Sequence, residues 1–359
     1  MGLKERLLSL APGHKDAKTE SDAAEPQDAF GLHLLYDGTK DAAESSLARD
    51  GNENPVCLEP VDIIAVHGLG GGAFSTWRHP KSGIMWLQDL LPYTMHMSRI
   101  MSYGYDAKIY KNRSTLHMMD NAENLLFEIQ AVRNSKTLQT RRIIFIGHGF
   151  GGLVIKKALI MAREEEKYQN VLRSTNGIMF MGTPHNGADA AKLASTIANI
   201  ANSITTLNTK NLKTLERDSV TLQEISRSFG FLTHFKIVTV IESDKTPIPY
   251  TNAYTLIVPR PSARLNLGDR ETVLSILGAD YHMICKFRGE DDKQYCKIKS
   301  ALVTLATTSS ASISTLQHIP CSPDAGFAGR TAILKDLHSA FSIRGKHTRV
   351  ALYGLGGIG

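Results

Sequence analysis

The stretch RRIIFIGHGFGGLVIKKALIMA, residues 141–162, decides the fold of this chain. An apolar run ends in closely spaced glycines and an apolar helical pattern follows, which predicts a buried strand, a tight turn and a helix. This layout is that of a nucleophile elbow, whose pattern is G-x-S-x-G and whose sharp turn exposes a serine above a sheet. Gly147, Gly151 and Gly152 would let the strand and the helix approach each other. The position of the serine holds Gly149.

Gly149 bears on both chemistry and stability. It has no side-chain oxygen for covalent catalysis, and it adopts the backbone geometry of such a turn more easily than any other residue. We therefore expect Gly149→Ser to lower the stability by about 1 kcal/mol. The alternative is a dinucleotide-binding turn, G-x-G-x-x-G. Gly147 and Gly149 fit its first two places and the third falls on Gly152, but no acid stands at the end of the next strand.

Apolar runs alternate with helical patterns along the middle of the chain. The predicted strands are FGLHLLYDG, VDIIAVHG, RIMSYGYD, RIIFIG, NGIMFMG, HFKIVTVIE and YTLIVP. The predicted helices are MWLQDLLP, residues 114–133 with Ser114 as N-cap, residues 153–163 and residues 188–204. This alternation predicts an α/β fold with a mostly parallel sheet and helices on both faces. Active sites of such sheets lie at the carboxyl ends of the strands.

Composition and charge narrow the function classes. The chain has 359 residues, of which 42% are hydrophobic and 21% charged, as in ordinary globular proteins. The net charge of +6 is not gathered in a basic block, so we expect no nucleic-acid partner. The four cysteines are scattered and no signal peptide is evident, so we expect an intracellular, cytoplasmic protein without a metal or cofactor. No run approaches the roughly 18 apolar residues of a membrane span, although LKERLLSL at residues 3–10 could touch a membrane surface.

Four segments together resemble a known family. VDIIAVHGLGGGAFSTWRHPKSGIMWLQDLLP, RIMSYGYDA, IFIGHGFGGLVIKKAL and GIMFMGTPHNGA are similar, in order and spacing, to the lipase-like α/β-hydrolases of the DUF676 group. They look more closely like the serine-active-site-containing proteins and their fungal relatives. The resemblance covers residues 31–299. It implies an α/β-hydrolase fold, a lipid or ester ligand, and peripheral association with mitochondrial or endoplasmic-reticulum membranes.

The resemblance also assigns catalytic positions. The nucleophile of the family falls on Gly149, and its acid falls on Glu242 at the end of KIVTVIE, in the order nucleophile, acid, base. The base of the family lies in a D-H-S-x-M-C-K-F motif, which reads DYHMICKF from Asp280 here. Without a gap, the histidine position holds Tyr281. His282 is then a displaced candidate for the base, which a slip of one residue could aim at the site.

Backbone N–H groups beside the turn could stabilise a developing oxyanion. Phe150 would open the helix, and its N–H would point at the reacting oxygen. A second donor would come from the HGLGG loop, at Leu69 and Gly70. The histidines of VHG and TPHNG, at positions 67 and 185, are expected to shape loops rather than to transfer protons. Direct attack by water, with His282 or His148 as base, would be a weak substitute for a serine nucleophile.

The ends of the chain predict further segments. Residues 1–28 read as a disordered tail, residues 29–306 as the hydrolase domain and residues 307–325 as a Ser/Thr/Pro linker. Residues 326–359 resemble the start of an NB-ARC or NACHT nucleotide-binding domain, with Gly354 and Gly359 in an incomplete P-loop. Because its Lys and Ser/Thr would follow Gly359, ATP or ADP could bind only if that domain were complete. In fungi such hydrolase domains often begin NLR-like receptors, so a downstream nucleotide-binding domain is an expected partner.

Three functions remain open from the sequence. The first is a degenerate lipase-like module that lacks its serine and acts as the effector or signalling domain of an NLR-like receptor. The second is an active serine-type lipid or ester hydrolase in which the serine has been replaced at Gly149. The third is a module that binds a lipid without cleaving it. The second departure, Tyr281, favours the first, because without nucleophile and base only oxyanion and binding contributions to catalysis remain.

Overall fold

The computed structural model describes residues 29–39, 60–107, 116–185, 190–204, 222–232 and 234–307. The chain divides into two compact units, Met1–Ser312 and Ile313–Gly359, and all of these residues belong to the first. Four of the expected features lie outside the described residues: the tail at 1–28, the Ser114 N-cap, nearly all of the linker, and the incomplete P-loop from Gly354 to Gly359.

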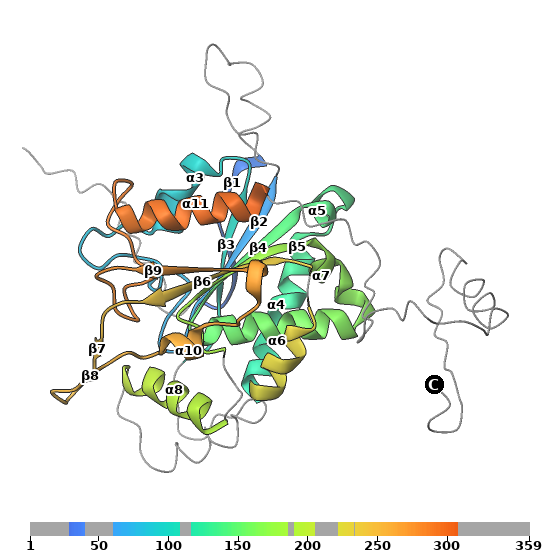
Figure 1. Ribbon diagram of the computed structural model, residues 1–359. Helices are drawn as coiled ribbons and strands as arrows, with labels where there is room; N and C mark the ends of the chain where they lie inside the picture. Colours follow the sequence, from blue (N-terminus) through green and yellow to red (C-terminus); the bar gives the residue numbers. More distant parts are fainter. Residues whose placement is uncertain are drawn as a thin grey trace, which may run out of the picture. The chain divides into compact units, whose positions relative to one another are not determined.

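Seven strands form the central sheet in the order β1-β3-β2-β4-β5-β6-β9 (Figure 1). Their bounds are Gly31–Asp37 (β1), Val61–Val66 (β2), Arg99–Gly104 (β3), Arg142–His148 (β4), Thr175–Met181 (β5), Lys236–Glu242 (β6) and Glu271–Ile276 (β9). β1 pairs antiparallel with β3, and the other five pairs of neighbours are parallel. The prediction of a mostly parallel sheet is therefore confirmed, with one antiparallel strand at its edge.

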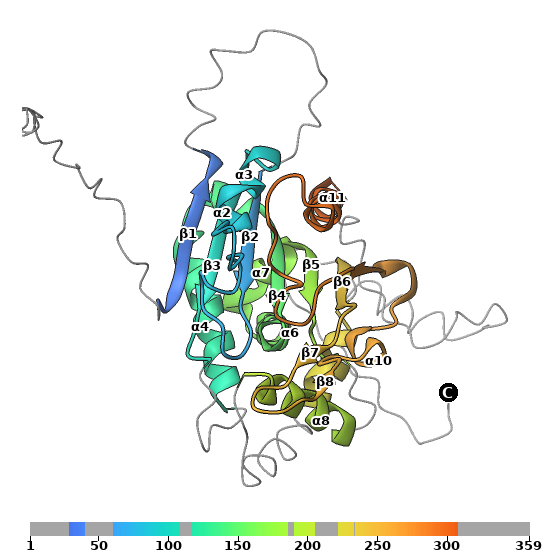
Figure 2. The same cartoon turned by 90° about the vertical axis from the view of Figure 1, so that its left-hand side faces the viewer.

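Helices cover both faces of this sheet (Figures 1 and 2). Their bounds are Trp86–Asp89 (α2), Leu91–Thr94 (α3), Leu116–Val132 (α4), Lys136–Thr140 (α5), Phe150–Glu164 (α6), Gln169–Ser174 (α7), Ala190–Asn202 (α8), Arg260–Ala263 (α10) and Lys293–Thr307 (α11), with short 3₁₀ turns at Glu166–Tyr168 and Gly268–Arg270. Residues 222–230 are also helical. The architecture is that of an α/β-hydrolase-like fold.

The central strand β2 shows how the apolar pattern builds two cores. Because successive side chains of a strand point to opposite faces, Ile64 and Val66 pack with buried residues of α4 and α6. Ile63 and Ala65 pack on the other face with residues of α2 and α11. All six residues of the strand are buried, as its continuous apolar run predicts.

The sequence patterns were wrong or silent in three places. YTLIVP was predicted as a strand of the sheet, but only Tyr254–Thr255 (β8) is extended, and it pairs antiparallel with Thr246–Pro247 (β7) in a separate hairpin. MWLQDLLP was predicted as one helix but forms two, because Pro92 lacks the N–H needed to continue the first. The patterns did not indicate the edge strand β9 or the last helix α11.

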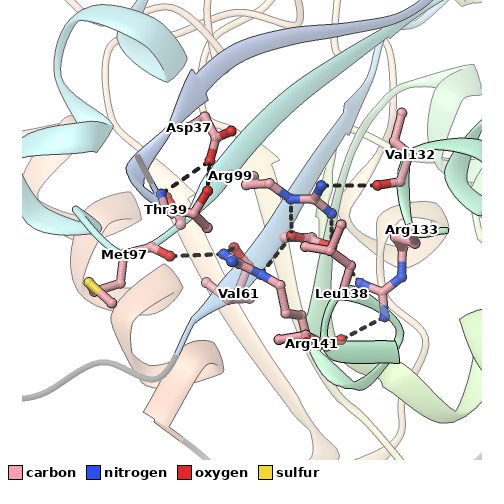
Figure 3. A network of polar contacts seen from close by, with 12 residues as sticks. Asp37, Thr39, Val61, Met97, Arg99, Val132, Arg133, Leu138 and Arg141 are labelled. Carbon is pink, nitrogen blue, oxygen red and sulfur yellow. Dashed lines mark hydrogen bonds and ion pairs between the residues drawn. The ribbon is translucent and has the colours of Figure 1, made fainter. Parts of the chain in front are cut away.

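A buried carboxylate stands at the amino end of β2. Asp62 is fully buried and carries three arginines, Arg99, Arg133 and Arg141, each less than a tenth exposed (Figure 3). Arg99 binds it in bidentate fashion, with Nε 2.9 Å from Oδ1 and Nη2 2.7 Å from Oδ2. Nε of Arg141 lies 3.1 Å from Oδ1. One acid therefore joins β2 to β3, to the end of α4 and to the start of β4.

Backbone carbonyls accept five further hydrogen bonds from the guanidinium groups of this network. Arg99 donates to the carbonyl of Val132, and Arg133 donates to those of Gln139 and Arg141. Arg141 in turn donates to the carbonyls of Val61 and Met97. Burial lowers the pKa of Arg133 and Arg141, and the charge of Asp62 opposes that effect. The network lies at the amino ends of the strands. The candidate site lies at the other end of the sheet, at the carboxyl ends of the strands.

Candidate functional site

The turn between β4 and α6 has the geometry of a nucleophile elbow. β4 ends at His148, α6 begins at Phe150, and Gly149 alone joins them with φ 52° and ψ −120°. Such a positive φ is unfavourable for side chains with a β-carbon, so a serine here would be held under strain. The Gly149 N–H donates to the carbonyl of Met181 on the neighbouring strand β5, 2.9 Å away. The predicted strand, turn and helix are confirmed, although the helix begins three residues earlier than expected.

The glycines that flank the turn pack too closely for any side chain. A β-carbon on Gly147 would lie 2.7 Å from the α-carbon of Gly152. One on Gly151 would overlap the carbonyl oxygens of Val66 and His67, at the end of β2. Real β-carbons do not approach other atoms this closely, so glycine is required at these positions for α6 to pack against β4 and β2.

The space beside Gly149 is filled by Tyr281. A β-carbon on Gly149 would overlap the hydroxyl oxygen of Tyr281 and would lie 3.1 Å from Cζ of the same ring. The tyrosine thus places its phenol where the side chain of a nucleophile would begin. Gly149 and Tyr281 fit each other, because the smaller residue makes room for the larger one.

The Tyr281 phenol is buried without a polar partner among the described residues. The side chain is 1% exposed, and its hydroxyl makes no hydrogen bond in the described part of the chain. It packs in an apolar cluster with Ile241, Ile257 and Val258. Burial raises the pKa of Tyr281 well above its usual value, and the charges of neighbouring acids add to the shift. The phenol is therefore neutral and is a poor general base at ordinary pH.

The carboxylate of Glu242 lies at the end of β6 and is bound by backbone and side-chain donors. Val258 N–H donates to Oε1 at 2.6 Å, and the Thr246 hydroxyl lies 3.5 Å from Oε2. Burial raises the pKa of Glu242 to about 7, against the opposing effect of the Val258 hydrogen bond. Thr246 also accepts a hydrogen bond from the Tyr281 N–H at 3.1 Å. Glu242 therefore lies near the family's base position, but its oxygens are bound to the segment 246–258.

His282 lies beside the elbow and is bound to other groups. Its backbone N–H donates to Asp280 Oδ1 at 3.0 Å. Its ring centroid lies 5.3 Å from that of Tyr281, edge to face. Burial lowers the pKa of His282, and the nearby His148 lowers it further. The structure thus brings His282 close to Tyr281, and among the described residues no hydrogen bond joins the His282 ring to Glu242.

The ring nitrogens of the other histidines near the site either bind backbone groups or have no hydrogen-bond partner among the described residues. His67 Nδ1 lies 2.9 Å from the Gly68 carbonyl, and its Nε2 accepts from the Tyr105 N–H at 3.1 Å. His148 Nε2 lies 3.0 Å from the carbonyl of Tyr281. Burial lowers the pKa of both imidazoles to about 4, so both are neutral at pH 7. Both ring nitrogens of His185 are buried without a partner among the described residues.

Two of the three expected oxyanion donors, Leu69 and Gly70, line a small cavity. This cavity of about 120 Å³ is also lined by His148, His282 and Ile204. The Gly70 N–H already donates to the carbonyl of Ala107 at 3.0 Å, so this donor is occupied. Phe150 is the first residue of α6, where helix N–H groups have no partner within the helix. Of the predicted set, Phe150 therefore has an N–H at a helix start, whereas that of Gly70 is already bonded.

Sequence reasoning missed the two residues that bind the Glu242 carboxylate. Thr246 and Val258 follow β6 closely in the chain, but no motif marks them as its partners. The sequence signal that did exist was the Gly149 and Tyr281 pair. At both positions this chain departs from the pattern of the family. The structure adds that the Tyr281 hydroxyl occupies the space of a side chain at position 149. Among the described residues, no cluster of His, Cys, Asp and Glu is suited to hold a metal.

Comparison with protein families agrees with this geometry. The model of a family described as "Putative serine esterase (DUF676)" matches residues 63–247, which is more than half of the chain. The matched segment includes Gly149 and Glu242, whereas Tyr281 and His282 lie beyond it. No helix in the described parts of the chain is both long and apolar enough to cross a membrane.

Curated relatives and solved structures are more distant. The chain is 27% identical to Protein SERAC1 of Danio rerio over 256 residues, which are 65% of this chain and 37% of the relative. It is 26% identical to Protein SERAC1 of Homo sapiens over 251 residues, 64% of this chain and 36% of the relative. The chain thus spans little more than a third of these relatives. Among solved structures, Bacillus licheniformis lipase BlEst2 is similar with a TM-score of 0.44 and 16% identity, covering 71% of this chain and 96% of the lipase. An esterase of Pyrobaculum calidifontis is similar with a TM-score of 0.42 and 12% identity, covering 72% of this chain and 77% of the esterase.

Proposed function

Because this chain belongs to the DUF676 family and carries a lipase- and esterase-like α/β-hydrolase module, we propose that the module no longer catalyses acyl transfer. It would serve instead as a binding or signalling domain of a longer protein. One observation carries the proposal: the Tyr281 hydroxyl occupies the space in which a side chain at Gly149 would begin. A single missing serine could be a replaced residue in an otherwise working enzyme. A missing serine whose space is filled by a second residue supports a site that has been packed closed and no longer catalyses.

The groups that would have served the serine support the same conclusion. Glu242 binds Val258 and Thr246, and no histidine ring is hydrogen-bonded to it among the described residues. The phenol of Tyr281 is buried and neutral, and burial lowers the pKa of His282. Without a nucleophile and an oriented base, only oxyanion and binding contributions to catalysis remain.

The two other functions receive less support. A serine hydrolase altered only at Gly149 would have room for the serine, and here the room is taken by Tyr281. A retained lipid would need a pocket of roughly 300–1,000 Å³. The cavity beside the elbow holds about 120 Å³, but a second cavity that shares Lys286 with it holds about 600 Å³, so lipid binding is the second candidate function. Mass spectrometry of the purified protein tests lipid binding directly, because a co-purifying lipid would support it.

Ester hydrolysis by a set of variants tests the proposed function. The substrate is p-nitrophenyl butyrate, and the proteins are wild type, Gly149→Ser, Tyr281→His and the double variant. We expect no turnover above the buffer rate from wild type or from Gly149→Ser, because Tyr281 would still fill the site. The double variant removes the overlap, so turnover that appears only there would support a lost active site.

Two results would overturn the proposal. One is wild-type turnover that disappears in Glu242→Gln or His282→Gln. The other is strong activity in Gly149→Ser alone, which would favour a hydrolase that lacks nothing but its serine. Thermal unfolding of each variant, followed by circular dichroism, separates lost activity from lost folding.

The wider context of the module is also a proposal. The resemblance of residues 326–359 to the entry of a nucleotide-binding domain supports an NLR-like receptor in which this module is the effector domain. Sequencing the complete transcript tests it. A Lys followed by Ser or Thr directly after Gly359 would support the receptor, and any other continuation would contradict it.

A further inference from the structure

A hairpin beside the candidate site exposes two tyrosines. β7 and β8 pair through Thr246–Thr255 and Pro247–Tyr254, and the hairpin extends away from the sheet (Figure 1). Tyr250, at the tip, is 92% exposed, and Tyr254, on β8, is 65% exposed. Their hydroxyls make no hydrogen bond with any described residue. Tyrosine is enriched at interfaces, so two exposed tyrosines on one short hairpin make it a candidate for binding a partner.

The tip is held in a conformation that tyrosine rarely adopts. Tyr250 has a φ of 63°, in the left-handed region where a bulky residue is an outlier. Hydrogen bonds across the tip hold it there: Ile248 N–H donates to the Ala253 carbonyl at 2.9 Å, and Thr251 N–H donates to the Ile248 carbonyl at 3.2 Å. The Thr251 hydroxyl also donates to Ile248, at 2.9 Å. Glycine or asparagine would fit this position better, so the exposed ring at a strained position points to a function.

The charges around the hairpin have an ordered layout. Residues 246–259 contain no charged side chain, and they include three prolines besides the two tyrosines. Three exposed cations stand at the ends of this stretch: Lys245 before it, and Arg260 and Arg264 after it. No described residue forms an ion pair with any of the three. Asp244, next to Lys245 in the chain, is an exposed acid and accepts a hydrogen bond from the Ser243 hydroxyl.

This layout matches the layers of an anionic bilayer. Tyrosine is enriched at membrane interfaces, where its ring lies among the acyl carbons and its hydroxyl meets water. Cations set behind an uncharged tip would meet the phosphate layer. A protein partner would be expected to pair the three cations with acids and to bury the tip in a pocket, but a bilayer needs only the order seen here. We propose that the β7–β8 hairpin docks on the surface of a membrane rich in anionic lipid.

The base of the hairpin is tied to the candidate site. Glu242 receives hydrogen bonds from Val258 and Thr246, which lie on the two sides of the hairpin, and Thr246 accepts from the Tyr281 N–H. The carboxylate at the family's acid position therefore ties the two ends of the hairpin together. This docking does not depend on whether the elbow is catalytic, so the proposed function and the docking can fail separately.

Vesicle flotation with the full chain tests the docking. The vesicles are phosphatidylcholine alone, or phosphatidylcholine with phosphatidylserine. We expect the wild type to float with the mixed vesicles and to stay in solution with phosphatidylcholine alone. Tyr250→Ser/Tyr254→Ser should lower the partition coefficient severalfold. Tyr93→Ser removes a tyrosine that is 80% exposed on α3, so it is the matched control and should bind like wild type.

Charge and depth are measured with two further proteins. Replacing Lys245, Arg260 and Arg264 by glutamine should lower partitioning about fivefold for each cation removed. Tyr250→Trp adds an exposed indole to a chain whose two tryptophans, Trp77 and Trp86, are fully buried. Brominated phosphatidylcholine in the mixed vesicles should quench the added indole.

Three outcomes would contradict the proposal: no wild-type binding to the mixed vesicles, equal loss in the Tyr93→Ser control, and an indole at position 250 that brominated lipid does not quench. Equal binding to both kinds of vesicle would contradict the role of the cations. Circular dichroism of each variant shows that a loss of binding is not a loss of folding.

Discussion

At the scale of single residues, the pair of Gly149 and Tyr281 determines what the site can do. The glycine has the φ of 52° that an elbow demands, and the tyrosine places its hydroxyl where a β-carbon would stand. Serine at position 149 would therefore meet two penalties, backbone strain and overlap with the phenol. The cost of Gly149→Ser should exceed the 1 kcal/mol or so that strain alone predicts.

The Tyr281 hydroxyl should contribute little to stability. A buried hydroxyl without a partner loses its hydrogen bonds to water and gains none, so its removal releases that penalty. We expect Tyr281→Phe to leave the free energy of unfolding unchanged or to raise it by about 1 kcal/mol. Urea denaturation followed by circular dichroism measures this change.

Tyr105→Phe is the matched control for that measurement. Tyr105 is also buried, but its hydroxyl donates to the carbonyl of His67 at 2.8 Å. Its loss leaves that carbonyl unpaired and should lower the stability by about 1 kcal/mol. A larger loss for Tyr281→Phe than for Tyr105→Phe would show that the Tyr281 hydroxyl has a partner in the folded chain.

Glu242 should make the stability depend on pH in an unusual direction. Its pKa rises from the ordinary 4.5 to about 7 on folding. Between these values the folded chain holds a proton that the unfolded chain releases, so the contribution of Glu242 to stability falls as the pH rises from 4.5 to 7. Glu242→Gln removes this dependence and keeps an acceptor for Val258. Relative to wild type, the variant should therefore gain stability across that range.

Urea denaturation of both proteins at a series of pH values measures this difference. The buried histidines His67 and His148 act in the opposite direction, because their lowered pKa values make stability rise from about pH 4 to 6.5. Both proteins share that background, so it cancels in the comparison. Glu290→Gln makes the same change at an exposed glutamate. A wild-type and Glu242→Gln difference that stays constant with pH would disprove the assignment.

At the scale of elements, β2 depends on one carboxylate. Asp62 holds three buried arginines that come from β3, from the end of α4 and from the start of β4. Asp62→Asn leaves the shape nearly unchanged but leaves three guanidinium groups without a counter-charge. Removal of one partner from a buried ion pair typically costs about 3–5 kcal/mol. We expect a loss in that range, measured by urea denaturation.

Asp291→Asn is the control for this change, because Asp291 is exposed and its replacement should alter stability by less than about 0.5 kcal/mol. If Asp62→Asn does not fold, Asp62→Glu keeps the charge and should recover a folded protein. A loss below about 1 kcal/mol for Asp62→Asn would mean that the backbone carbonyls alone satisfy the arginines.

At the scale of the whole molecule, the sequence predicted the sheet well and the site in part. Apolar runs such as VDIIAVHG belong to strands buried on both faces, which leave a continuous pattern that can be read without a structure. β9 lies at the edge of the sheet and most of it is only half-buried, so its pattern is weaker. YTLIVP has the composition of a strand but turns away after two residues, because Glu242 binds the backbone at Val258.

Sequence motifs predict the parts of the site that lie within one segment. They do not predict contacts between residues that are far apart in the chain. The strand, turn and helix of the elbow could be placed from the residues, and the acid position at Glu242 is a prediction that rests on the family resemblance. The contact between Gly149 and Tyr281 joins residues 132 positions apart, and no pattern within a segment reports it. The same is true of the hydrogen bonds of Glu242, whose partners depend on how the hairpin folds back.

The contact between Gly149 and Tyr281 also bears on how such a site could change over generations. Under the proposed function, a mutation that restores serine alone meets the phenol and weakens the fold. A mutation that restores histidine at position 281 alone opens a space beside a turn that still has no nucleophile. Neither step offers selection an advantage, so the way back to an enzyme needs both at once. Activity lost by this route would be hard to regain, because the packing of Tyr281 against Gly149 disfavours each single reversion.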